Sequence, residues 1–183
     1  MARALRYYGD PALRRKAAPA AAFDAELAAL VADLFEGMYR EKGVGLAAPQ
    51  LGESTRVFVV DVEDDAGRTK RAFVNPVITR REGTITGEEG CLSIPGYRED
   101  VKRWAVIEVE ARDETGRPFS LTAGGLLARA IQHELDHLDG ILFIDRLSPI
   151  KRKLLEARLK KFQAPVSASS KLALGAEGSA SSL

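Results

Sequence analysis

The chain has two histidines, and both lie in one short segment, His133-Glu134-Leu135-Asp136-His137. On an α-helix, side chains four positions apart project from the same face, so His133 and His137 can hold one metal ion while Glu134 lies beside it. Imidazole nitrogens suit zinc or ferrous iron, and a hydrolytic site of this kind takes three protein ligands and leaves one position for water. The segment therefore predicts a metal-dependent hydrolase whose third ligand lies elsewhere in the chain.

The residues around this segment predict a buried helix over residues 126–138. Its apolar members occupy several sides, as in a central helix: Leu126, Leu127, Ala130, Ile131, Leu135 and Leu138. Gly124 and Gly125 precede the helix, and Gly140 is a suitable C-terminal stop. A surface helix with an incidental histidine pair is the alternative, and the apolar neighbours argue against it.

Cys91, the only cysteine, is the candidate for the third ligand. A single cysteine is most often a small buried hydrophobic residue, and it cannot form a disulfide within its own chain. Because the chain has no third histidine, and because Gly90 would let the backbone approach a metal closely, we expect a Cys91 thiolate to complete the set with His133 and His137. The lack of a disulfide partner also favours a reducing, cytoplasmic location.

A third segment, residues 43–50, is glycine-rich and predicts a loop rather than a core strand. It lacks the Lys-Ser/Thr ending of a phosphate-binding P-loop, which argues against nucleotide binding. Its backbone N–H and C=O groups are open to a ligand, and it ends in one amide donor, Gln50.

Together, residues 43–50, 89–93 and 132–140 resemble the three signatures of the peptide deformylases, GxGLAAxQ, EGCLS and QHExDHLxG, in the same order. The resemblance extends over about residues 1–162, and three motifs in order are much harder to meet by chance than one. It implies removal of the formyl group from N-formylmethionine at the start of newly synthesised proteins, with release of formate.

The resemblance also implies roles for the residues of the site. Cys91, His133 and His137 would bind the metal, with Fe(II) as the expected ion and zinc, nickel or cobalt as substitutes. Glu134 would be the general acid/base, which takes a proton from a water molecule activated by the metal and passes it to the departing amine.

Further roles concern the substrate. Gln50 and the backbone N–H of Leu92 would donate to the oxyanion, and Gly45 would contact the peptide backbone. The predicted methionine pocket draws on residues beside the glycine loop and before His133: Val44, Leu126 and Ala130. Core packing is an equally good interpretation of these three. Arg129 fits the pocket poorly and is expected to turn away, and Glu89 and Arg98 are candidates to support the metal ligands.

The remaining sequence predicts one α+β domain over residues 1–163, with mostly antiparallel β-sheets around the central HExxH-bearing helix. Periodicity predicts an N-terminal helix over residues 24–42 and strands over residues 56–62, 71–79 and 101–112. Residues 1–16 contain no apolar signal or membrane segment. Residues 164–183 are rich in Ala, Ser and Gly, and we expect them to be disordered.

A basic helix is predicted over residues 148–162, although the whole chain carries a net charge of only +1. A solvated helix face is the ordinary explanation for such charge, and attachment to ribosomal RNA is the functional one. Its basic residues outnumber the single acidic Glu156: Lys151, Arg152, Lys153, Arg158, Lys160 and Lys161. We expect no binding to DNA or to a membrane.

Two other functions compete with the deformylase hypothesis. A zincin-type peptidase also uses HExxH, but it takes its third ligand from downstream, where this chain offers mainly Asp139, Asp145 and Glu156. A catalytically silent ribosome-binding protein could keep a metal for structure alone. Glu134 and Gln50 argue against the second alternative, because a structural metal site needs neither.

Overall fold

The centre of the fold is one helix held against a strongly curved antiparallel sheet. The computed structural model describes residues 3–65 and 67–162. In chain order, the elements are η1 (Pro11–Arg14), α1 (Ala25–Arg40), β1 (Gly45–Ala47), η2 (Ala48–Leu51), β2 (Val57–Asp64), β3 (Gly67–Cys91), β4 (Ile94–Arg112), β5 (Pro118–Gly124), α2 (Gly125–Leu138), η3 (Phe143–Arg146) and α3 (Pro149–Phe162). The strands form a five-stranded sheet in the order β1-β2-β3-β4-β5, which confirms the predicted α+β class.

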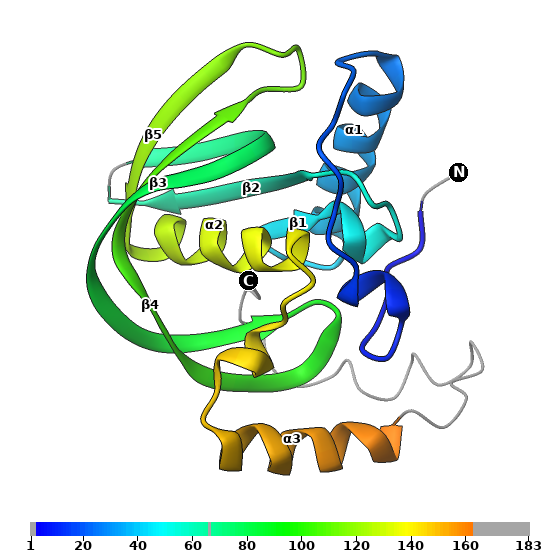
Figure 1. Cartoon of the computed structure of the whole chain (residues 1–183), viewed down its shortest axis with the longest axis vertical. Helices are drawn as coiled ribbons and strands as arrows, with labels where there is room; N and C mark the ends of the chain where they lie inside the picture. Colours follow the sequence, from blue (N-terminus) through cyan, green and yellow to red (C-terminus); the bar gives the residue numbers. More distant parts are fainter. Residues whose placement is uncertain (1–2, 66, 163–183) are drawn as a thin grey trace.

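Strand β2 is buried on both faces and separates two apolar clusters. Phe58 and Val60 belong to the cluster around α2, whereas Val57 and Val59 belong to the cluster around α1. Successive side chains of a strand point to opposite faces, so a strand packed on both sides is apolar at consecutive positions. Figure 1 shows the result, with α2 crossing the concave side of the sheet and α1 beside the other face of β1 and β2.

Helix α1 directly precedes the glycine-rich segment, residues 43–50. The Asp24 carboxylate accepts hydrogen bonds from the backbone N–H groups of Glu26 and Leu27, which caps the first turn. At the other end, Lys42 adopts the left-handed conformation with φ of 58°, and the N–H of Gly43 donates to the carbonyl of Met38. The helix thus ends just before β1, close to the predicted boundary.

The strands differ from the prediction in three places. Strand β3 continues to Cys91, far beyond the expected residues 71–79. Strand β4 begins at Ile94 and not at residue 101, and β5 was not predicted. The extra part of β3 is exposed on both faces over residues 80–86, so it lacks the apolar alternation that marks a half-buried strand. Its pairing with β4 extends this long hairpin to the metal-ligand candidate.

The glycine-rich segment is also more regular than expected. Instead of a loop throughout, residues 45–47 form the edge strand β1, which pairs with β2, and residues 48–51 form the short helix η2. All these residues are buried, because α1, β2 and α2 pack around the segment.

Helix α3 lies beside the β3–β4 hairpin, and its Leu155 and Leu159 cover a third apolar cluster (Figure 1). Its start at Pro149 agrees with the predicted basic helix. Within residues 3–65 and 67–162, no helix combines the length and the apolar composition needed to cross a bilayer. The expected disordered tail, residues 164–183, lies outside the described residues.

Candidate metal centre and active site

Helix α2 brings the two histidines and Glu134 to the middle of the molecule. The helix spans Gly125–Leu138, and the apolar cluster of buried side chains around it includes Ala130 and Ile131. His133, Glu134 and His137 are each about 1% exposed. Polar side chains at such depth need partners, because burying an unsatisfied polar group is costly.

The third candidate, Cys91, reaches the histidines from the end of β3. The pairing of β3 with β4 shifts register between Gly90 and Cys91, so the strand is locally distorted where the sulfur turns toward α2. The sulfur of Cys91 lies 3.2 Å from Nε2 of His137. One ligand atom from each of Cys91, His133 and His137 lies within 4.8 Å of the others.

The geometry and chemistry of this cluster fit a metal ion. Nε2 of His133 is buried without a hydrogen-bond partner among the described residues, as expected for a donor atom reserved for a metal. Zn–S and Zn–N bonds of about 2.3 and 2.0 Å in a tetrahedral arrangement place sulfur and nitrogen about 3.5 Å apart, close to the observed separation. One thiolate and two imidazoles leave a fourth position for a reacting group.

Glu134 lies beside the cluster and directly under β1. Both of its carboxylate oxygens are buried without a hydrogen-bond partner in the described part of the chain. A Cβ atom added to Gly45 would lie 2.5 Å from Oε1 of Glu134, so only glycine leaves room for this carboxylate. Burial raises the pKa of Glu134 well above its usual range, and the negative charge of Glu89 adds to the effect.

The side-chain amide of Gln50 points toward the sulfur of Cys91. Its Oε1 accepts from the backbone N–H of Ala47 at 2.9 Å, which fixes the orientation of the side chain. Its Nε2 donates to the hydroxyl of Ser93 at 3.2 Å and lies 3.6 Å from the sulfur of Cys91. Leu92 follows Cys91 in the turn between β3 and β4, so its backbone lies between these two contacts.

A buried charge network supports His133 from behind. Oε2 of Glu89 lies 3.1 Å from Nδ1 of His133, and the Glu89 carboxylate also receives two hydrogen bonds from Arg103, at 2.8 and 2.9 Å. A third arginine contact comes from Arg129 at 2.8 Å, and Arg103 reaches on to Asp136 at 2.6 Å. A carboxylate on Nδ1 orients the ring so that Nε2 faces the metal position.

The charges in this network shift the pKa values of their neighbours. Burial alone would raise the pKa of the Glu89 carboxyl, but hydrogen bonds and positive charge from Arg103, with His133, hold it below the usual range. Burial raises the pKa of the Cys91 thiol to about 12, with the Glu134 charge contributing. Burial likewise lowers the pKa of His137, which keeps the imidazole neutral, as a metal ligand must be.

Sequence reasoning suggested Glu89 but missed Arg103, Asp136 and Ser93. Arg103 carried a signal, because it lies on the inward face of β4 in alternation with Val101 and Ile107. An arginine at such a position requires a buried carboxylate. Ser93 carried no comparable signal, because its contact with Gln50 joins segments that are far apart in the chain.

The other predicted residues are distributed unevenly around the site. Val44 and Ala130 pack in the apolar cluster around α2, whereas Leu126, on the first turn of α2, is 42% exposed. Arg129 turns toward the carbonyls of Gly87 and Val101. Arg98 forms an ion pair with the exposed Glu88.

The downstream carboxylates of the peptidase alternative are engaged elsewhere. Asp139 pairs with Arg56, Asp145 pairs with Arg14 and Arg152, and Glu156 pairs with Arg152. None of the three acids joins the cluster of ligand atoms in the described chain. The zincin ligand set is therefore not assembled.

We expect replacement of Glu89 to damage both the fold and the metal site. Glu89→Gln leaves the buried Arg129 without its carboxylate and Arg103 with Asp136 alone, a type of change that costs about 3–5 kcal/mol of unfolding free energy. Loss of the bond to His133 should weaken metal binding by about 10- to 100-fold. Denaturant unfolding and competition with a chromogenic chelator measure the two effects.

Glu88→Gln is the matched control, because the adjacent Glu88 is exposed and its ion pair is with Arg98, outside the buried network. We expect its unfolding free energy to stay within about 0.5 kcal/mol of the wild type. Equal stability and equal metal affinity of the two variants would contradict a supporting role for Glu89.

Comparisons with known proteins agree with this site. The family model described as polypeptide deformylase matches residues 2–153. A peptide deformylase of Alkalilimnicola ehrlichii is 49% identical over 154 residues, which cover 84% of this chain and 86% of that protein. The crystal structure of a peptide deformylase from Legionella pneumophila is 44% identical and superposes with a TM-score of 0.82, covering 88% of this chain and 95% of that one.

A second solved structure, the peptide deformylase of Thermus thermophilus, is 50% identical with a TM-score of 0.79 and covers 86% of this chain and 93% of its own. The similarity thus extends over the sheet, α2 and all three motif segments. Sequence, architecture and the geometry around Cys91, His133 and His137 lead to the same conclusion, namely that this chain belongs to the peptide deformylase family.

Proposed function

We propose that this chain hydrolyses the formyl amide of N-formylmethionyl nascent peptides in the cytoplasm and releases formate. The observation that carries the proposal is the cluster of Cys91, His133 and His137 with the buried carboxylate of Glu134 beside it. Residues 1–163 form the catalytic domain in this proposal, and the packing of Leu155 and Leu159 in the same apolar cluster as Cys91 supports the inclusion of α3.

The three ligand side chains define what metal the site accepts. We propose Fe(II) as the resident ion, with zinc, nickel or cobalt as functional substitutes, because one thiolate and two imidazoles accommodate all of them. When bound, such an ion polarises a carbonyl group and lowers the pKa of water toward neutrality. Cys91 binds it as a thiolate, so metal binding has to displace the proton that burial otherwise holds on the sulfur.

Glu134 is the general acid/base in this proposal. Its carboxylate accepts a proton from the attacking water and returns it to the departing amine of methionine. Because burial raises the pKa of Glu134, its carboxylate takes up a proton more readily than an exposed glutamate does, which suits a group that accepts and returns a proton. Removal of water by the surrounding apolar cluster strengthens its interactions with the reacting atoms.

Gln50 and the backbone N–H of Leu92 donate to the oxyanion that forms on the formyl oxygen. The side-chain oxygen Oε1 of Gln50 accepts from Ala47, which leaves the side-chain N–H₂ of Gln50 facing Cys91. This is the orientation that a donor requires. Donors held in place before the reaction stabilise the transition state without any cost of reorganisation.

The peptide is bound through the free edge of β1. This strand pairs with β2 on one side only in the described sheet, so Gly45 can pair with an extended peptide on the other side. Backbone pairing tolerates many sequences after methionine. The methionine side chain lies among Val44, Leu126 and Ala130, and the exposed position of Leu126 at the start of α2 suits the mouth of such a pocket.

The direct test is formate release from an N-formylmethionyl tripeptide by protein reconstituted with Fe(II) or Ni(II) under anaerobic conditions. We expect turnover that disappears when a chelator removes the metal and returns when the metal is restored. The matching N-acetyl peptide should react at least about 100-fold more slowly, because its methyl group crowds a site shaped for hydrogen. Metal-loaded protein that releases no formate would reject the proposal.

We also propose that the outer face of α3 attaches the enzyme to ribosomal RNA near the emerging peptide. Two of its basic residues are already paired within the chain, since Lys151 contacts Glu99 and Arg152 contacts Glu156. The exposed cations that remain available in the described part of the helix are Lys153, Arg158 and Lys160.

Changing these three residues together to glutamate should weaken salt-sensitive sedimentation with ribosomes by at least about tenfold, because each phosphate contact contributes to the salt dependence. Turnover of a free tripeptide should stay unchanged. The matched control changes three exposed cations of the β3–β4 hairpin to glutamate, namely Arg80, Arg81 and Lys102. An identical effect of the two triple variants would rule out a specific role for α3.

A further inference from the structure

The N-terminal segment, residues 5–18, makes one backbone hydrogen bond to each of the three motif segments. The N–H of Arg6 donates to the carbonyl of Gln50 at 2.7 Å, and the N–H of Tyr8 donates to the carbonyl of Ser93 at 2.8 Å. The N–H of Ala17 donates to the carbonyl of Leu138 at 2.8 Å. We call residues 5–18 the strap. Figure 1 shows it in dark blue, passing the turn between β3 and β4 and the end of α2.

We propose that the Arg6–Tyr8 part of the strap is a positioning element for the oxyanion donors. It acts through Gln50 and Ser93 and does not itself contact the substrate. The inference rests on the roles proposed above for Gln50 and for the N–H of Leu92.

The first argument is the pairing of the two contacts. Gln50 and Ser93 are 43 positions apart in the chain and come from different elements, η2 and the turn after β3. Arg6 and Tyr8 are separated by one residue, so their backbone atoms can be at most about 7 Å apart. Binding one carbonyl from each element therefore limits the distance between Gln50 and Ser93.

The second argument is that the strap closes a ring around the oxyanion position. Nε2 of Gln50 already donates to the Ser93 hydroxyl at 3.2 Å, which links the two residues through their side chains. The strap links the same two residues through their carbonyls. Leu92, whose N–H is the other proposed donor, directly precedes Ser93. Both donors are thus attached to residues that the strap holds.

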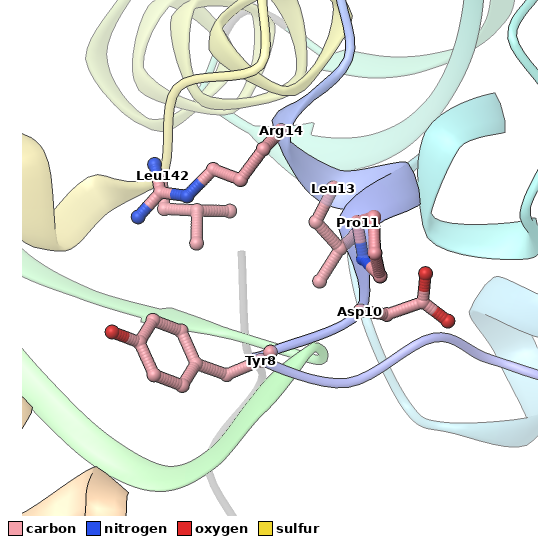
Figure 2. Close-up of a pocket in the computed structure, with 7 residues that line it drawn as sticks. Tyr8, Asp10, Pro11, Leu13, Arg14 and Leu142 are labelled. Carbon is pink, nitrogen blue, oxygen red and sulfur yellow. The ribbon is translucent and has the colours of Figure 1, made fainter.

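The third argument concerns what holds the strap itself. Leu13 is 1% exposed and packs in the same apolar cluster as Cys91 and Leu142, and Arg14 forms an ion pair with Asp145. Between these anchors remains a cavity of about 150 Å³, which Figure 2 shows between η1 and Leu142. Tyr7 and Tyr8 pack against two different apolar clusters, so this packing and the two backbone hydrogen bonds together fix the path of residues 6–8.

The test removes one backbone donor and leaves every side chain in place. Translation with the α-hydroxy acid analogue of tyrosine at position 8 converts the amide to an ester and deletes the N–H that binds Ser93. The matched control makes the same change at Ala18, whose N–H donates to the carbonyl of Ser54 at the same distance, 2.8 Å. Each protein then lacks one bond of equal length.

We expect the ester at Tyr8 to lower kcat for the N-formylmethionyl tripeptide by about tenfold, a part of the 100- to 1000-fold effect of losing an oxyanion donor. KM and bound metal should stay within about twofold of the wild type, because the donors act mainly in the transition state. The ester at Ala18 should leave kcat within about twofold.

Equal values of kcat for the two esters would overturn the inference, whether both are reduced or both are unchanged. A defect at Tyr8 that appears in metal content or only in KM would overturn it as well, since either result indicates a general structural role. Absence of turnover in the metal-loaded wild type is a different result, which would reject the proposed function and the strap inference together.

Discussion

Replacing Glu134 with glutamine is expected to lower kcat by about 100- to 10,000-fold, the contribution typical of a positioned general acid/base. The amide of glutamine has nearly the same shape as the carboxylate but cannot accept and return a proton at neutral pH. Both carboxylate oxygens of Glu134 are buried without a partner in the described chain, so no described residue is hydrogen-bonded to this carboxylate and placed to relay the proton instead. Formate release under saturating substrate measures the loss.

The interpretation depends on an intact metal site. Glu134 is not one of the three clustered ligand residues, so the glutamine variant should bind one metal ion with nearly unchanged affinity. Metal content and circular dichroism check this point. A variant that keeps both its metal and more than about a tenth of the wild-type kcat would remove Glu134 from the chemistry.

Replacing Gly45 with alanine is expected to lower kcat by a similar factor, although the substitution changes no ionisable residue. The added Cβ would lie 2.5 Å from Oε1 and 2.9 Å from Cδ and Cγ of Glu134, all shorter than ordinary contacts. Glu134 is about 1% exposed, so it cannot move aside into solvent. Overpacking of this kind costs about 1–3 kcal/mol of unfolding free energy, and it displaces the carboxylate from the reacting atoms.

Gly124→Ala is the matched control, because the nearest atom to its added Cβ is the carbonyl oxygen of Ala105 at an ordinary 3.8 Å. This variant should keep kcat within about twofold and lose at most about 1 kcal/mol of stability. A double variant tests the mechanism of the Gly45 effect. If the clash with Glu134 is the cause, Gly45→Ala should cost little stability in a Glu134→Ala background. The same cost in both backgrounds would show that the cause lies elsewhere.

Local patterns were sufficient to predict the helices and the chemistry that they carry. The spacing of His133, Glu134 and His137 required only the geometry of one helix. Helix α2, Gly125–Leu138, agrees within one residue with the predicted helix over residues 126–138. The start of α1 followed from Asp24, whose carboxylate caps the first turn as such residues commonly do. These features depend on residues within four or five positions of one another, so the sequence alone contains the necessary information.

The strands were less predictable where their stability comes from partners. Residues 80–86 of β3 are exposed and polar, and they form a strand because β4 supplies hydrogen bonds along their length. The glycine-rich residues 45–47 form a strand because β2 lies beside them. In both places pairing with a distant segment outweighs weak local propensity.

The sequence by itself determined the types of residue in the site: two histidines and a glutamate at helical spacing, one cysteine, and a glycine loop ending in Gln50. Only the tertiary structure decided which of them meet and what holds them. It brings the sulfur of Cys91 to His137, and it joins Glu89 to His133 and Arg103. It also attaches the strap to all three motifs. Such contacts depend on how the sheet and the helix pack together. They join residues that are far apart in the chain, so local sequence patterns do not indicate them.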